Sequence, residues 1–158
     1  TRSGDIDVSL APYAMEKEGK SVGGILEILN KKSGFLGISQ LSSDSRDIED
    51  AIKEGNEQAI LAQKMFVNSV VKYISQYYVE MGGCDVLAFT AGIGENSIST
   101  REEIVEQLGC LGIKLDVEAN NVRGELTCIS SKDSNTLVYL VPTNEELMIA
   151  MDTVALIK

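Results

Sequence analysis

The stretch Asp85–Asn96 constrains the fold more than any other part of this sequence. It opens as a short apolar, partly β-branched run, which predicts a strand buried on both faces. It then passes through Gly92 and Gly94, flanked by polar residues, into a helical pattern. Glycine lacks a Cβ and the following helix presents free N–H groups, so such a turn can hold a phosphate or a nucleotide. The same turn can also do no more than begin a helix.

Helical and strand patterns alternate along the rest of the chain. Strands are predicted over residues 85–89, 111–115, 125–130 and 136–141, and residues 35–39 are expected to form an apolar connector. Helices are predicted over residues 10–17, 21–30, 42–53, 56–81, 97–108, 117–121 and 142–158, the fifth capped by Ser97 or Ser99. This alternation indicates the α/β class, with helices flanking a mixed sheet. The 158 residues fit one domain with one core.

Composition excludes several classes of function. The net charge of −10 argues against a nucleic-acid partner. No apolar run reaches the roughly 18 residues that a membrane span needs. Three widely spaced cysteines without a CxxC pair, in a chain that has no histidine, argue against a zinc site and indicate reduced thiols of a cytosolic protein. The missing histidine also excludes an imidazole base within this chain.

Two polar stretches before the glycine motif offer charged side chains. Arg2 lies in a predicted loop, where its guanidinium can neutralise a transferring phosphoryl group or form a solvated pair with Asp5 or Asp7. Asp44 and Arg46 lie at a predicted helix start. There the carboxylate can cap the helix while the arginine stays on the surface, or the two side chains can hold the ribose and base of a nucleotide.

The last predicted helix begins with two glutamates. If Thr143 is the N-cap, Glu146 falls at the third helical position and completes a capping box. Glu145 is then free to face a ligand. One carboxylate, together with phosphate oxygens and waters, is a usual way of holding Mg²⁺. The spacing therefore favours Glu145 as the metal ligand.

Six segments, in this order, resemble the acetate kinase family. They are Thr1–Asp7, Asn30–Gly34, Ser42–Asp47, Asp85–Asn96, Val122–Glu125 and Pro142–Glu146. The resemblance implies an incomplete C-terminal domain of the actin-like ATPase (ribonuclease H-like) fold. Family members are cytoplasmic homodimers that transfer the γ-phosphoryl group of ATP to acetate, reversibly, giving acetyl phosphate and ADP with Mg²⁺ as cofactor.

The resemblance also implies roles for individual residues. Arg2 would stabilise the transition state, and Glu145 would bind Mg²⁺. Ser45 stands where the family usually has a larger apolar or aromatic residue, so neighbours such as Ile93 can supply the apolar surface for the adenine instead. The residues implied to contact the nucleotide are Asp44, Ser45, Arg46, Gly92, Ile93, Gly94, Glu95 and Asn96.

The resemblance further implies that residues 1–158 are the nucleotide-binding C-terminal portion of such an enzyme. The family's acetate-binding arginine, catalytic aspartate, histidine and second Mg²⁺ ligand have no counterpart here. Because phosphoryl transfer needs donor, acceptor and metal held together in line, we expect no turnover from this chain alone. Two alternatives stay open: a propionate or butyrate kinase of the same family, and a free-standing nucleotide-binding or interaction module.

Overall fold

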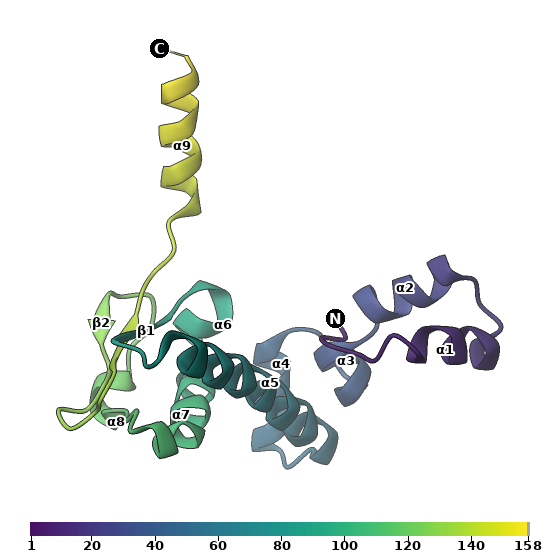
Figure 1. Cartoon of the computed structure of the whole chain (residues 1–158), viewed down its shortest axis with the longest axis horizontal. Coiled ribbons are helices and arrows are strands. Elements are labelled where there is room, and N and C mark those ends of the chain that lie inside the picture. The colour runs from purple at the N-terminus through teal and green to yellow at the C-terminus, as the bar shows by residue number, and fades with distance from the viewer. Residues whose placement is uncertain (158) are drawn as a thin grey trace. The chain divides into compact units, whose positions relative to one another are not determined.

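The structure, a computed structural model, describes residues 1–157 and divides into two compact units (Figure 1). The first unit is Thr1–Ser69 and the second begins at Val70. The length predicts one core, whereas each unit has buried residues of its own. Helix α5 (Glu57–Met81) belongs to both units. Its 25 residues extend roughly 37 Å, more than the roughly 30 Å of a small domain, and its buried residues, Ala59, Ala62, Gln63 and Val67, all lie in the first unit.

The first unit is helical. It contains α1 (Leu10–Glu18), α2 (Val22–Lys31), α3 (Gly34–Ser39), α4 (Ser45–Lys53) and the first half of α5. Two predicted N-caps are confirmed, because the side chain of Ser21 accepts a hydrogen bond from the Gly24 N–H and that of Asp44 accepts one from the Arg46 N–H. These caps involve only neighbouring residues, which explains why the sequence predicts them.

The expectation of a connector at residues 35–39 is wrong, because these residues form α3. Packing supplies the reason. The Phe35 ring lies 5.0 Å, centroid to centroid, from the ring of Phe66 and packs on a buried cluster that includes Ile48 and Ala59. The Ser39 hydroxyl donates to the Phe35 carbonyl and supports the last turn. Burial of Phe35 thus stabilises a helix too short to form alone.

The second unit contains a three-stranded mixed sheet. Its strands are β1 (Val86–Phe89), β2 (Thr127–Cys128) and β3 (Leu137–Leu140), in the order β1-β3-β2. β1 runs parallel to β3, and β2 runs antiparallel to it. Its helices, besides the end of α5, are α6 (Ala91–Asn96), α7 (Ile98–Gln107), α8 (Val117–Asn120) and α9 (Glu145–Leu156). A mixed sheet with flanking helices is therefore confirmed, and Ser97 is the N-cap of α7.

Two strand predictions need correction. Residues 109–111 form a 3₁₀ turn, and only Leu115 makes an isolated bridge, because Gly112 has a left-handed backbone (φ 78°) that interrupts an extended run. The expectation that β1 is buried on both faces is also wrong. Val86 is 52% exposed and Phe89 is the one buried residue of β1, which is an edge strand of the sheet in residues 1–157.

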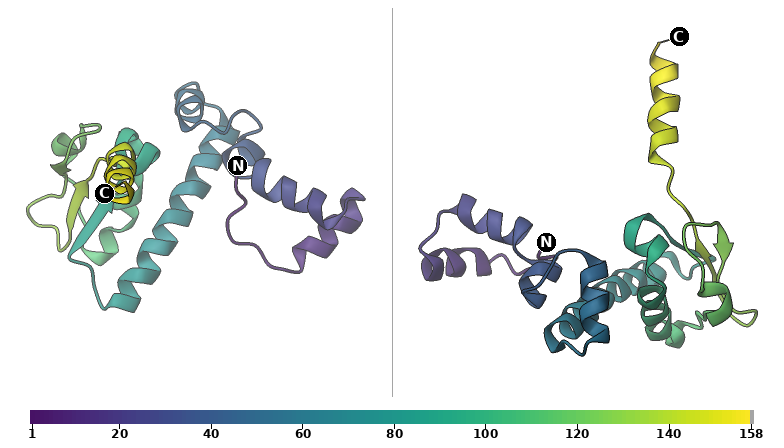
Figure 2. Two further views of the ribbon diagram at one scale, coloured as in Figure 1. Left: turned by 90° about the horizontal axis from the view of Figure 1, so that it is seen from above. Right: turned by 180° about the vertical axis from the view of Figure 1, so that it is seen from behind.

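The parallel pairing of β1 and β3 positions the predicted site. Phe89 is in register with Leu140, so both strands end at the same edge of the sheet. α6 follows β1 at that edge, and the segment leading to α9 follows β3 (Figure 1). α9 itself extends away from the sheet, and none of Glu145–Leu156 is buried (Figure 2). No helix within residues 1–157 is long and apolar enough to cross a bilayer.

Candidate functional site

The glycine motif is a short helix rather than a glycine turn, which corrects the first expectation about it. Residues 91–96 form α6, and the left-handed residue is Ala91, with φ 59°. A non-glycine residue in this region costs roughly 1–2 kcal/mol. Such backbone strain persists only where the surrounding structure enforces it, and it concentrates at functional sites.

The two glycines of α6 have different structural settings. A Cβ at Gly94 would lie 3.3 Å from the carbonyl carbon of Phe89, so the absence of a side chain lets α6 pack closely on the end of β1. A Cβ at Gly92 would meet no atom within 4 Å, and Gly92 has no positive φ. Neither packing nor backbone conformation within residues 1–157 requires a glycine at position 92. Close approach of a ligand to the α6 backbone would require it.

A buried arginine on α7 donates hydrogen bonds to the last turn of α6. Arg101 on α7 is 0% exposed, and its Nη1 donates to the carbonyl oxygens of Gly94 (2.9 Å) and Glu95 (3.1 Å). Its Nε and Nη2 donate to the side chain and carbonyl of Asn120 and to the carbonyl of Val122. These bonds attach the last turn of α6 to the chain around α8.

Sequence analysis missed Arg101, although a signal exists. Arg101 precedes Ile104, Val105 and Leu108 by three, four and seven residues, which is the spacing of one helix face. All three apolar residues are buried. A charged residue on a buried helix face predicts that its charged group is fully hydrogen-bonded inside the protein. Burial, and secondarily the charge of Arg123, lowers the pKa of the Arg101 guanidinium from its usual value.

Glu95 connects α6 to the segment before α9. Its Oε1 accepts hydrogen bonds from the Thr143 N–H (2.9 Å) and the Thr143 hydroxyl (2.7 Å). These bonds, and to a smaller extent the backbone of Ala91, lower the pKa of the Glu95 carboxyl from its usual value, which favours its ionised form. The next side chain, Asn96, donates from Nδ2 to the Gly92 carbonyl at 2.9 Å.

The predicted capping box at the start of α9 is wrong. The N-cap is Asn144, whose side chain accepts from the Leu147 N–H at 3.0 Å, while the Thr143 hydroxyl bonds to Glu95. Glu145 and Glu146 are therefore the first two residues of α9, and capping does not distinguish them. Both are exposed. The assignment of the metal to Glu145 stays a prediction that rests on the family resemblance.

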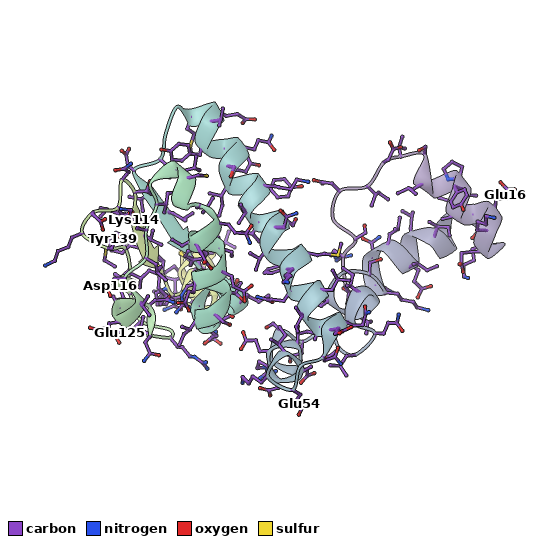
Figure 3. The ribbon with its side chains drawn as sticks, turned by 90° about the horizontal axis from the view of Figure 1, so that it is seen from below. Glu16, Glu54, Lys114, Asp116, Glu125 and Tyr139 are labelled. Atoms are coloured by element: carbon purple, nitrogen blue, oxygen red, sulfur yellow. The ribbon has the colours of Figure 1, made fainter. Side chains whose placement is uncertain are left out.

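No group of three or more His, Cys, Asp or Glu residues within 1–157 is arranged to hold a metal ion. The acidic charge is instead spread over exposed side chains. Glu16 and Glu54 of the first unit, for example, point away from the ribbon (Figure 3). A Mg²⁺ ion held by Glu145 would therefore need phosphate oxygens and waters as its other ligands.

Asp44 and Arg46 form a self-contained pair at the start of α4. Arg46 donates from its backbone N–H and its guanidinium to the Asp44 carboxylate, at distances of 2.5–3.2 Å. These bonds lower the pKa of Asp44 to about 2. The Arg46 side chain is 85% exposed, and Ser45 between them is half-buried. The observed geometry is that of a cap with a surface arginine, and it leaves the guanidinium accessible.

Arg2 lies in a loop that is attached to the end of α2. The Arg2 guanidinium donates to Asn30 Oδ1 at 2.9 Å, so its observed partner is an amide on α2. The Ser33 N–H donates to the Thr1 carbonyl. A Cβ at Gly34 would lie 2.8 Å from the Arg2 carbonyl, so this glycine permits the close approach. The structure thus holds the Arg2 backbone in a defined position within the first unit.

The predicted site residues divide between the two units. Gly92–Asn96 and Glu145 lie at one edge of the sheet in the second unit, joined through Glu95 and Thr143. Arg2 and the Asp44–Arg46 pair lie in the first unit, each with its own local partners. The sheet edge at the carboxyl ends of parallel strands is where α/β proteins usually bind ligands.

Solved structures with the same fold are kinases of small carboxylic acids. An acetate kinase from Porphyromonas gingivalis superposes with a TM-score of 0.93 at 48% identity, covering 100% of this chain and 40% of that one. A propionate kinase from Francisella tularensis gives a TM-score of 0.88 at 39% identity, covering 95% of this chain and 38% of that one. The chain therefore has the α/β fold of the corresponding part of these two structures.

The chain belongs to the acetokinase family, whose model matches residues 1–151. Relatives named acetate kinase from Treponema denticola and Halothermothrix orenii are 56% and 52% identical over all 158 residues. The chain spans 40% of the length of these relatives.

Proposed function

We propose that this chain is the nucleotide- and Mg²⁺-binding part of an acetate kinase, which transfers the γ-phosphoryl group of ATP to acetate and forms acetyl phosphate and ADP reversibly. Membership of the acetokinase family supports the reaction class. The observation that carries the nucleotide assignment is Gly92. It is a glycine that nothing in residues 1–157 requires, next to a strained Ala91, at the sheet edge where Glu145 also lies.

The proposed roles follow the order of the motifs. Arg2 offsets negative charge on the transferring phosphoryl group, because a guanidinium presents several donors in a rigid fork. Glu145 holds Mg²⁺ together with phosphate oxygens and waters. The nucleotide is held by the Asp44–Arg46 pair with Ser45, and by the α6 residues Gly92, Ile93, Gly94, Glu95 and Asn96. The half-buried Ile93 supplies apolar surface for the base.

Calorimetric titration of the full-length protein with MgADP tests this assignment. Gly92→Val should weaken MgADP binding at least tenfold while leaving the thermal midpoint nearly unchanged, since its Cβ meets no neighbour. Glu145→Ala should reduce the difference between titrations with and without Mg²⁺. Unaltered MgADP affinity in Gly92→Val, in a protein that binds MgADP, would contradict the assignment of α6 to the nucleotide.

The acyl acceptor has a second candidate. The propionate kinase from Francisella tularensis shares this fold at 39% identity, so propionate or butyrate can replace acetate within the same family. Initial rates of the full-length protein with acetate, propionate and butyrate decide between them. The highest kcat/KM for acetate supports the proposal, and the highest value for a longer acid replaces acetate by that acid.

The chain by itself is proposed to be inactive, because it carries the proposed nucleotide-binding groups and no counterpart of the family's acetate-binding arginine or catalytic aspartate. Acetyl phosphate formation by purified residues 1–158, lost on Arg2→Ala, would overturn this proposal. For the whole enzyme we propose a cytoplasmic homodimer that uses ATP or ADP and acetate or acetyl phosphate, with no nucleic-acid or membrane partner.

A further inference from the structure

The link between α6 and the start of α9 joins the two parts of the proposed site that come from different strands. The link spans 48 residues of sequence, and Oε1 of Glu95 accepts both of its hydrogen bonds. Only one residue, Asn144, separates Thr143 from Glu145, so at most about 7 Å of backbone lies between them. The position of Thr143 therefore sets the position of Glu145 within narrow limits.

Thr143 forms hydrogen bonds with Glu95 and does not cap α9. Threonine is a common N-cap, yet Asn144 caps α9 here, and the N–H and the hydroxyl of Thr143 both donate to Glu95. α9 adds little restraint, because none of its residues is buried. The position of Glu145 relative to α6 thus depends on the Glu95 carboxylate and on the pairing of β3 with β1.

Direct contact of Glu95 with the phosphates of a nucleotide is unfavourable. The carboxylate is negatively charged at neutral pH, as an ordinary glutamate is, and the Thr143 donors lower its pKa further. Like charges repel, so an ionised carboxylate next to phosphate oxygens weakens binding. The same carboxylate costs nothing electrostatically when it holds neutral donors at a distance from the phosphates. The Glu95 backbone is separately fixed by Arg101, which bonds its carbonyl oxygen.

We propose that Glu95 is a positioning residue that holds Glu145 in reach of the metal-bound nucleotide, and that its side chain does not contact the nucleotide. This inference rests on the proposed function and narrows it, because it removes the Glu95 side chain from the groups that contact the nucleotide and leaves Glu95 among the site residues through its support of Glu145. It assigns Glu95 to the Mg²⁺-dependent part of nucleotide affinity. Removal of the Glu95–Thr143 link should displace Glu145 and leave the contacts of Gly92 unchanged.

The test is calorimetric titration of the full-length protein with ADP, in excess Mg²⁺ and in EDTA. Glu95→Ala should weaken binding in Mg²⁺ about tenfold and binding in EDTA less than about twofold, as expected for loss of hydrogen bonds to a charged group. Thr143→Val keeps the N–H and loses the hydroxyl, so its effect in Mg²⁺ should be about threefold. Glu95→Gln keeps an acceptor oxygen and should recover most of the affinity.

The double variant Glu95→Ala/Thr143→Val separates coupling from independent effects. Because both changes break one link, the double variant should bind MgADP no more weakly than Glu95→Ala. Glu106→Ala, which removes an exposed carboxylate on α7, is the matched control for charge and should leave both titrations unchanged. Thermal midpoints of all variants identify any that fail to fold, and the conservative Glu95→Gln then carries the comparison.

Three results would overturn the inference. Equal weakening in Mg²⁺ and EDTA by Glu95→Ala means that Glu95 contacts the nucleotide itself. Additive effects in the double variant mean that Glu95 and Thr143 act separately. Normal MgADP binding by Glu95→Ala means that β-strand pairing alone positions Glu145. If the wild-type protein binds no ADP with or without Mg²⁺, the proposed function itself is refuted. This outcome differs from the three above, because each of those requires a wild-type protein that binds ADP.

Discussion

The starts of α4 and α9 make an instructive comparison, because each places carboxylates where a helix begins. At α4 the arrangement is local: Asp44 caps the helix and pairs with Arg46, two residues away. At α9 the arrangement is long-range: Thr143 is held by Glu95 from α6, and Asn144 takes over the cap. The start of α4 can form as soon as its helix forms, whereas the start of α9 needs the sheet and α6 in place.

The two helix starts therefore differ in which residues they depend on. The pair at α4 leaves an exposed guanidinium on a rigid cap, which suits recognition of a ligand from the surface. The start of α9 depends on a chain of supports that runs from Arg101 through α6 and Glu95 to Thr143. Substitutions at the start of α4 should therefore destabilise only α4, whereas substitution of Arg101 should destabilise the second unit more widely.

Replacement of Arg101 should have the largest effect. Arg101→Met removes every hydrogen bond of the buried guanidinium and should destabilise the second unit by about 3 kcal/mol, since each buried acceptor left unpaired costs about 1–3 kcal/mol. Urea denaturation measures the loss, and hydrogen exchange should place it in residues 70 onward. Arg46→Met is the matched control. Its denaturation midpoint should move little, because Arg46 is exposed.

Substitution of the two α6 glycines should give the next largest effect. Gly94→Ala brings a Cβ to 3.3 Å from the Phe89 backbone and should displace α6 from β1. Gly92→Ala meets no neighbour and gains helix propensity. We expect Gly94→Ala to be about 2 kcal/mol less stable than Gly92→Ala. Equal thermal midpoints for the two variants would show that α6 does not depend on its contact with β1.

Loss of the Asp44 cap should have a smaller and local effect. Asp44→Ala should lower the thermal midpoint by a few degrees, and amide exchange should increase in α4 and not in α9. The Asp44 pKa falls from 3.8 to about 2, so its contribution to stability is present above about pH 4 and is lost as the pH falls toward 2. Asp44→Asn keeps the capping oxygen and should remove this part of the acid sensitivity.

Titration of Glu95 should give the smallest effect, detectable as a chemical-shift change. Hydrogen bonds from Thr143 lower the Glu95 pKa from 4.5, so the link is intact above that value and is lost as the pH falls through the lowered pKa. NMR should show the Thr143 amide resonance shifting with the Glu95 carboxylate. In Glu95→Gln that shift should vanish. If the chemical shift of the Thr143 amide in the wild type does not change as the carboxyl titrates, the start of α9 does not depend on Glu95 and the contrast with α4 is wrong.

Local features of this fold are predictable from the sequence, and long-range ones are not. The caps at Ser21, Asp44 and Ser97 depend on residues within three positions of the helix start, so the sequence indicates all three, with capping as one of two roles for Asp44 and Ser97 as one of two candidates for α7. The cap at α9 is mispredicted, because Glu95, 48 residues away, binds the Thr143 hydroxyl. The helix α3 is missed for the same reason, since Phe35 packs on a residue far along the chain.

The sequence by itself determined the α/β alternation and the family, because periodicity and the order of motifs can be read directly along the chain. Tertiary structure decided which strand ends meet, that Arg101 is buried under α6, and that Glu95 holds Thr143. Burial and hydrogen bonding of polar groups depend on what the rest of the fold brings near them. Which distant residues come into contact is decided by the folded structure and cannot be derived from a single sequence.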